Sequence, residues 1–174
     1  MNPAPLCIEL TRGNSLESFH YVDVAVADLS GKKILAWGDC EKLVLPRSAI
    51  KPLQALPLIE TGAAEAFQLS EIEIALACSS HNGEKLHVEA VENWLSKVGC
   101  SPDDLACGQH DPMDFNLVKE EMLHGDYLKV AANNCSGKHT GFLTVMRHLG
   151  IDHKNYLHPN HQLHTDYVTP ILSE

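Results

Sequence analysis

Basic residues are scarce in this sequence, and long hydrophobic runs are absent. The 174 residues include 13 Lys and Arg against 23 Asp and Glu, which gives a formal net charge of −10. A chain this acidic, without a block of Lys or Arg, is poorly suited to nucleic acids or anionic membranes, because neutralising phosphate supplies much of that affinity. The apolar stretch 53–59 is interrupted by Gln54 and Pro57 and is too short to span a membrane. Residues 1–10 lack the basic and apolar regions of a secretory signal, so we expect a cytoplasmic protein.

The sequence also has no closely spaced cysteine pair and few aromatic residues. None of the 6 cysteines forms a Cys-x-x-Cys pair, and without an export signal we expect reduced, partly buried thiols rather than a disulfide framework. Aromatic residues make up 6% of the chain, but 44% of it is hydrophobic and 21% charged, which is typical of globular proteins. Wholesale disorder is therefore excluded, and the length suits one domain or part of a larger one.

The first part of the chain predicts β-structure. Residues alternate at 7–11 and at 22–26, turn residues occupy 29–32, and a second short apolar run covers 34–37. A three-stranded antiparallel meander is the simplest structure that these segments can form.

Farther along, apolar residues at three- and four-residue spacing predict helices. The clearest is 84–98, and Gly99 follows where a helix end favours positive φ. Residues 114–124 and 138–149 show the same pattern, whereas 71–77 fits either a helix or a buried strand. Antiparallel strands followed by helices that cover them predict an α/β protein of the α+β sandwich type.

The first candidate for chemistry is Ser48-x-x-Lys51, in a segment that we expect to be helical and kinked at Pro57. Residues three apart on a helix are about 5–6 Å apart at Cβ, so a neutral Lys51 amine could take the proton of the Ser48 hydroxyl. Arg47 is a neighbouring cation that would favour the neutral amine. Because such a short pattern often occurs by chance, an N-capping serine followed by a solvated lysine is the alternative.

A polar turn at 78–83 lies between an apolar segment and the clearest predicted helix. Backbone N–H groups at a helix start favour anions and developing oxyanions. The alternative is ordinary capping of that helix by Ser80 or Asn82.

A second polar turn, 133–139, also follows an apolar segment and precedes a predicted helix. Its Cys135 and His139 are of types that suit zinc. Lys138 would be an unusual ligand, because a lysine amine normally keeps its proton up to about pH 10.4. A turn with a free thiol is the alternative. The histidines of the C-terminal part show no metal-ligand spacing and are expected at the surface, namely His148, His153, His158, His161 and His164.

Taken in this order, three segments resemble a known family. Residues 47–52, 78–83 and 133–139, supported by 108–112, resemble the class 3 (rhizobial-type) L-asparaginases of the asparaginase II family, a zinc-containing Ser-Lys amidohydrolase group. The similarity runs along the whole chain. It implies a fold like that of serine β-lactamases and glutaminases, a homodimer, and L-asparagine as the small-molecule substrate.

The resemblance also implies roles for single residues. Ser48 would be the nucleophile, Lys51 its base, and Ser80 the serine of a second Ser-Lys pair. Cys135 and Lys138 would be two of three protein ligands to one zinc ion, the third lying outside this chain. The substrate-binding residues would be Arg47, His81, Asn134 and His139.

This chain is shorter than the members of that family and ends at 169–174 without a helix cap or stop signal. We therefore interpret residues 1–174 as the N-terminal portion of a single L-asparaginase-like domain, which would lack part of the site. Its expected reaction is hydrolysis of asparagine to aspartate and ammonia through an acyl-enzyme. The alternatives are a non-catalytic zinc-binding module, an inactive truncated fragment, or another Ser-Lys hydrolase of the β-lactamase or penicillin-binding type.

Overall fold

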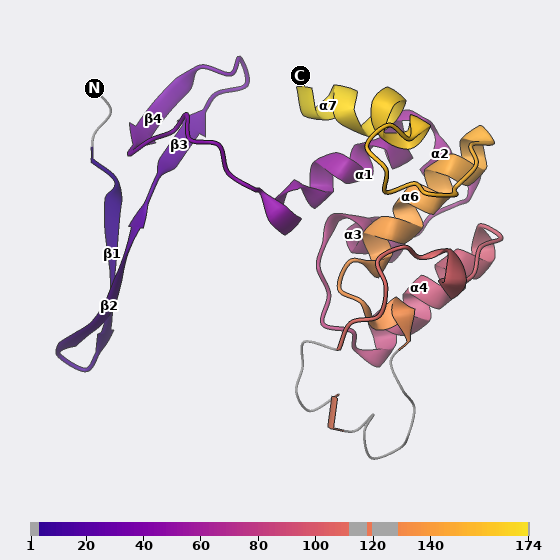
Figure 1. The fold of residues 1–174 in the computed structure, drawn as a ribbon, viewed down its shortest axis with the longest axis horizontal. Helices are drawn as coiled ribbons and strands as arrows, with labels where there is room; N and C mark the ends of the chain where they lie inside the picture. The colour runs from indigo at the N-terminus through magenta and orange to yellow at the C-terminus, as the bar shows by residue number, and fades with distance from the viewer. Residues whose placement is uncertain (1–3, 112–117, 120–128, 174) are drawn as a thin grey trace. The chain divides into compact units, whose positions relative to one another are not determined.

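The computed structural model describes residues 4–111, 118–119 and 129–173. Contacts within the chain divide it into two units, Met1–Leu45 and Pro46–Glu174. The expected α/β composition is confirmed, with antiparallel strands in the first unit and helices in the second (Figure 1). A single domain over the whole chain stays a prediction. No helix in these described ranges is long and apolar enough to cross a membrane.

The N-terminal unit consists of two β-hairpins. β1 (Leu6–Arg12) pairs antiparallel with β2 (Ser15–Val22), and β3 (Val24–Ala27) pairs antiparallel with β4 (Lys33–Trp37). Every residue of β1 is exposed, and an isolated two-stranded hairpin is only marginally stable in water.

The predicted three-stranded meander is wrong, because the described residues form four strands in two separate two-stranded sheets. The expected strand 22–26 is divided at Asp23, between β2 and β3. Asp is unfavourable inside strands, and here the Asp23 carboxylate accepts the backbone N–H of Asp39 at 2.9 Å. One continuous strand is thus replaced by the end of one hairpin and the start of the next.

The C-terminal unit is helical. Its elements are η1 (Arg47–Ile50), α1 (Lys51–Glu60), α2 (Ala63–Ala66), α3 (Glu71–Cys78), α4 (Lys85–Lys97), η2 (Pro102–Asp104), η3 (Val130–Ala132), α6 (Ser136–Leu149), η4 (Leu163–Val168) and α7 (Thr169–Ser173). Helix α6 lies at the centre and contacts α1, α2, α3 and α4 (Figure 1).

The core forms where α6 meets its neighbours. Leu58, Trp94 and Leu143, from three different helices, are each no more than 1% exposed. A Cβ atom on Gly141 would lie 3.2 Å from Leu58 Cδ1 and 3.7 Å from Trp94 Cη2, so the absence of a side chain lets these helices approach closely. The close packing of α6 fixes the position of its first turn, which carries several predicted site residues.

Most of the helix predictions are confirmed. Residues 84–98 and 138–149 correspond to α4 and α6, and α6 begins two residues earlier than expected. The ambiguous segment 71–77 is helical, as α3. Pro57 lies inside α1, which continues to Glu60. The predicted helix 114–124 falls almost entirely outside the described residues.

The predicted capping of α4 by Ser80 or Asn82 is wrong. The N-cap residue is Glu84, and its side chain makes no capping hydrogen bond. The turn at 78–83 therefore does not serve as the cap of this helix.

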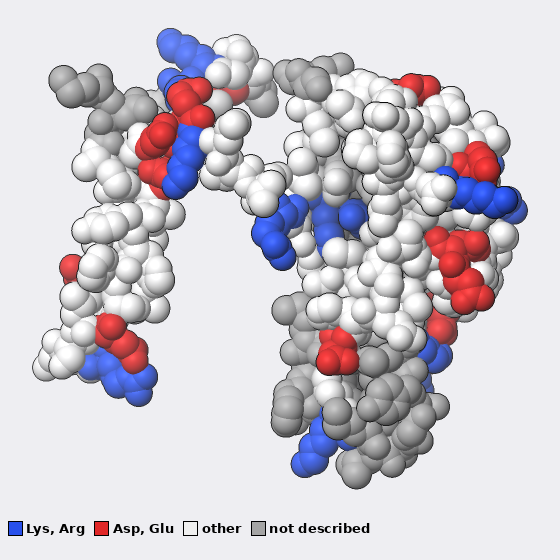
Figure 2. Space-filling model, in the orientation of Figure 1, with Lys and Arg blue, Asp and Glu red and all other residues white. Residues whose placement is uncertain are grey.

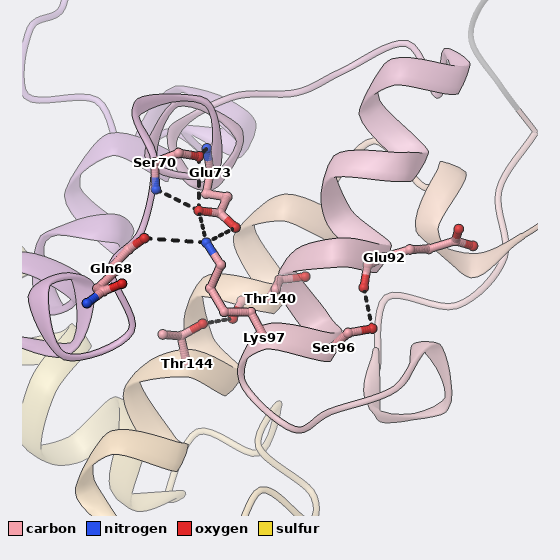
Figure 3. A network of polar contacts seen from close by, with 8 residues as sticks. All are labelled: Gln68, Ser70, Glu73, Glu92, Ser96, Lys97, Thr140 and Thr144. Carbon is pink, nitrogen blue, oxygen red and sulfur yellow. Dashed lines mark hydrogen bonds and ion pairs between the residues drawn. The ribbon is translucent and has the colours of Figure 1, made fainter.

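A buried carboxylate joins α3 to α4. Ser70 and Glu73 form a capping box, in which Glu73 Oε2 accepts the Ser70 N–H at 2.6 Å and Ser70 Oγ accepts the Glu73 N–H at 3.3 Å. Figure 3 shows that Lys97 donates to the same carboxylate, at 2.7 Å, and to the carbonyl of Gln68. Burial raises the pKa of Glu73, but the hydrogen bonds from Lys97 and Ser70 outweigh it and hold that pKa below its ordinary value.

Replacing Glu73 with Gln should lower the free energy of unfolding by about 1–3 kcal/mol at pH 7, because Lys97 loses its charged partner. The pKa of Glu73 is lower in the folded state than its ordinary value of 4.5. The stabilisation is therefore complete above the unfolded pKa and is lost as the pH falls through the folded one. Urea unfolding of both proteins across this range should show the difference shrinking in acid. Glu71→Gln, at an exposed position of the same helical turn, is the control, and a difference independent of pH would contradict the role of the ion pair.

Candidate functional site

The Lys51 side chain lies at the centre of the candidate site. It is 2% exposed. Its Nζ donates to the carbonyl of Ser79 at 2.8 Å, to Ser80 Oγ at 2.8 Å and to the carbonyl of Asn134 at 3.1 Å. An ammonium group has three N–H donors, so these acceptors use all of them. The alternative of a solvated lysine is therefore wrong.

Ser48 lies one helical turn before Lys51, as the sequence predicts. The backbone N–H of Lys51 donates to the carbonyl of Ser48, and the Ser48 side chain is exposed. Pro46, not Ser48, is the N-cap residue of η1, so the capping alternative for this serine is wrong. Arg47 has φ of 51°, a left-handed conformation that costs a non-glycine residue about 1–2 kcal/mol. The structure thus brings Lys51 into contact with Ser80, while Ser48 lies three residues before Lys51 and is not among the three hydrogen-bond acceptors of its amine.

Close packing of α6 on α3 places the second polar turn beside the first. A Cβ atom on Gly137 would lie 2.5 Å from the carbonyl oxygen of Leu76 and 2.9 Å from its Cβ. No side chain fits in this space. Because Gly137 has no side chain, Ser79, Ser80 and Asn134 can all contact Lys51.

His81 connects the two turns. Its Nε2 lies 2.8 Å from Ser136 Oγ, and because that hydroxyl donates its only proton to the carbonyl of Ala131, His81 must be the donor. Its Nδ1 accepts the backbone N–H of Gly83 at 3.1 Å. Burial lowers the pKa of His81 to about 4, so the ring is neutral at pH 7. Both ring nitrogens therefore serve the structure, and the expected contact of His81 with substrate stays a prediction.

Asn133 holds the turn that carries Cys135. Its side chain donates to the carbonyls of Cys107 at 3.1 Å and Gly108 at 3.0 Å, and its Oδ1 accepts the backbone N–H of Cys135 at 2.8 Å. The residue is 6% exposed. Sequence reasoning assigned it no role, although it lies within the motif that carries the resemblance.

Cys135 and Lys138 are suitably placed to share a metal ion. Cys135 is the N-cap residue of α6 and Lys138 lies in its first turn, three residues later, so their side chains are neighbours. Burial lowers the pKa of Lys138, Cys135 acts in the opposite direction, and Lys51 lowers it further. A lower pKa favours the neutral amine, which is the form that binds metals. The pair therefore fits two positions of a tetrahedral zinc site. Within the described ranges, no three His, Cys, Asp or Glu side chains could hold a metal by themselves.

His139 is 4% exposed, the same fraction as His81. Its Nδ1 lies 2.7 Å from the hydroxyl of Tyr156. Burial lowers the pKa of His139 to about 3, and the nearby charges of Lys138 and Lys51 act in the same direction. The ring is therefore neutral. Tyr156 comes from a distant loop, and no sequence signal pointed to it.

The five histidines of the C-terminal part are exposed or half-buried, as expected, and bind nearby protein groups. Three donate Nε2–H to backbone carbonyls, one accepts a backbone N–H, and one pairs with the carboxylate of Asp104. The three that donate are His148, His161 and His164. His158 accepts the backbone N–H, and His153 pairs with Asp104.

The electrostatic character of the site is cationic. Basic side chains gather over the start of α1 in Figure 2. None of Arg47, Lys51 and Lys138 takes part in an ion pair with a described residue. Of these groups Arg47 has no hydrogen-bonded acceptor among the described side chains, and an unpaired cation raises the local concentration of anions.

A surface pocket opens beside Ser80, which accepts a hydrogen bond from Lys51. It has a volume of about 430 Å³ and is lined by Ser79, Ser80 and His87 among others. Pockets of this size commonly accept small molecules. A larger hollow of about 850 Å³ in the N-terminal unit contains none of the predicted site residues.

These site residues fall within one family match. The L-asparaginase II family matches residues 8–171. The chain belongs to the L-asparaginase II family. The match includes the whole candidate site, from Arg47 to His139, and the resemblance that its motifs indicated is confirmed. No curated protein matches the sequence. Membership of the L-asparaginase II family supports an asparaginase-type hydrolase that acts on a small molecule.

Replacing Gly137 with Ala tests whether the close approach of α6 and α3 shapes the site. In a free helix this substitution would stabilise by about 1 kcal/mol. Here the added methyl meets the carbonyl of Leu76, so we expect the free energy of unfolding to fall by about 1–3 kcal/mol. Urea unfolding measures the sign directly, and a variant more stable than the parent would contradict the tight packing.

Proposed function

We propose that this chain carries the nucleophile and the proton-transfer groups of a site that hydrolyses L-asparagine to L-aspartate and ammonia. The observation that carries the proposal is the buried Lys51 ammonium, bonded to Ser80 Oγ and one helical turn from Ser48, in a chain of the L-asparaginase II family. A cytoplasmic homodimer that acts on this small molecule completes the proposal.

The charge of the site supports an amino acid amide as substrate. Arg47 is a cation without an ion pair to a described residue, and the α-carboxylate of asparagine would neutralise its charge. Asn134 and His139 lie in the turn whose backbone contacts Lys51, and they supply polar groups for the rest of the substrate.

The reaction follows the order of an acyl transfer. Lys51 first loses one ammonium proton to water, and Ser48 Oγ then forms a bond to the side-chain amide carbon while the neutral Lys51 amine takes the hydroxyl proton. The C–N bond then breaks, and Lys51 gives this proton to the leaving nitrogen, which departs as ammonia. Water attacks the ester carbon while Lys51 takes a proton from that water; the C–O bond to Ser48 then breaks, and Lys51 gives the proton to Ser48 Oγ, which leaves as the hydroxyl. Ser80 holds the Lys51 amine in place through the 2.8 Å hydrogen bond.

Backbone N–H groups stabilise the negative oxygen that forms in each step. Those in the first turn of α6, after Ser136, are the candidates, because the Gly83 N–H already donates to His81 Nδ1. Cys135 and Lys138 would hold a zinc ion, which supplies a Lewis acid that orients and polarises the substrate.

Ser48→Ala should lower the rate of ammonia release from L-asparagine by roughly a thousandfold or more, because no other group can carry the acyl intermediate. Ser80→Ala removes a partner of Lys51 but not the nucleophile, and we expect a smaller loss. Ser96→Ala, on the exposed face of α4, is the matched control and should leave the rate unchanged.

The nucleophile itself can be identified by trapping. An asparagine analogue with a diazoketone in place of the side-chain amide should form a covalent adduct, which peptide mass spectrometry assigns to Ser48. An adduct on Ser80 would exchange the roles of the two serines, and full activity of Ser48→Ala would refute the proposal.

A further inference from the structure

Tyr156 is fixed on three sides although it lies in a loop between α6 and η4. The residue is 2% exposed. Its hydroxyl oxygen lies 2.8 Å from the backbone nitrogen of Ala106 and 2.7 Å from His139 Nδ1. Its carbonyl accepts the Nε2–H of His164 at 2.7 Å. Contacts at both ends of the residue hold the hydroxyl against the histidine ring.

The protons of this group can be assigned by counting donors and acceptors. The Ala106 amide always donates, so the Tyr156 oxygen is an acceptor in that contact. If the Tyr156 proton goes to His139 Nδ1, all the groups are satisfied. If His139 donates instead, the Tyr156 proton has no acceptor among the described residues, and an unsatisfied buried donor is destabilising. The first arrangement is therefore favoured.

The ionisation of both groups agrees with this assignment. Burial raises the pKa of Tyr156 above its ordinary value, so the phenol keeps its proton. Because Nδ1 accepts the Tyr156 proton, the His139 ring is neutral and carries a single proton. With Nδ1 acting as the acceptor, that proton is on Nε2.

The other edge of the ring carries the remaining proton. His139 lies in the first turn of α6, one residue after Lys138, and its Nε2 makes no hydrogen bond with a described residue. The group can donate to an oxygen but cannot accept from an ammonium or an amide N–H.

We propose that Tyr156 is a positioning residue that holds His139 as the Nε2–H tautomer and so presents a fixed hydrogen-bond donor to an oxygen atom of the substrate. The identity of that substrate, an amino acid amide, rests on the proposed function, whereas the tautomer does not. Tyr156 thereby determines that an acceptor oxygen of the substrate, and not an N–H group, can face His139.

Nuclear magnetic resonance of the ¹⁵N-labelled chain tests the tautomer without any need for activity. Long-range ¹H–¹⁵N correlations should show a protonated Nε2 and an unprotonated Nδ1 for His139, with a correlation from the Tyr156 hydroxyl proton to Nδ1. A protonated Nδ1, or the absence of that correlation, would overturn the proposal even before any substitution is made.

Tyr156→Phe removes only the hydroxyl group. We expect the His139 signals to move toward a mixture of both tautomers, while Tyr167→Phe, at a half-buried tyrosine nearby in sequence, leaves them unchanged. If Tyr156→Phe keeps the pure Nε2–H form, Tyr156 does not hold the tautomer and the proposal fails.

Kinetics supply a separate readout. In Tyr156→Phe the KM for L-asparagine should rise about fivefold with a smaller change in kcat, as expected for one weakened hydrogen bond to bound substrate. An unchanged KM would overturn the link to substrate. A chain without asparaginase activity would count against the proposed function, and the tautomer measurement would still decide the role of Tyr156.

Discussion

Burial of the Lys51 ammonium is the interaction on which the rest of the site depends. A cation removed from water is tolerated only when its N–H groups find acceptors, and Lys51 has three. These come from the loop after α3, at Ser79 and Ser80, and from the turn before α6, at Asn134. One side chain on α1 therefore ties together the two polar turns, and the fold cannot separate them without leaving the charge unpaired.

Close backbone packing is what makes this arrangement possible. Gly137 lets the first turn of α6 approach the carbonyl of Leu76, and the amide of Asn133 and the ring of His81 then hold the two turns in place. Side chains that do not take part in the proposed chemistry thus determine its geometry. The same holds for Tyr156, which acts through the ring of His139. The geometry of the site therefore depends on how α6 packs against its neighbours, and not on any one sequence motif alone.

Sequence patterns predicted the elements that have a regular apolar face, such as α4 and α6, and failed where tertiary contacts decide. The helix α3 could have been recognised from Ser70 and Glu73, which form the capping-box pattern. The prediction of a three-stranded meander was wrong because Asp23 interrupts the expected strand, and its carboxylate accepts the backbone N–H of the distant Asp39. The polar motifs showed which residues belong to the site, but burial of Lys51 has no periodic signal. Tyr156 reaches its partner from 17 positions away, so no local pattern could reveal it.

Lys51 holds both polar turns together, and hydrogen exchange of the Lys51→Met variant measures this most directly. Met has a similar length but donates no hydrogen bond, so the acceptors in both turns lose their partner at once. We predict that the amides of residues 79–83 and 133–138 lose protection together, while the start of α3, held by Glu73 and Lys97, keeps the protection of the parent protein. Unchanged protection in both turns, or loss in only one of them, would contradict the account.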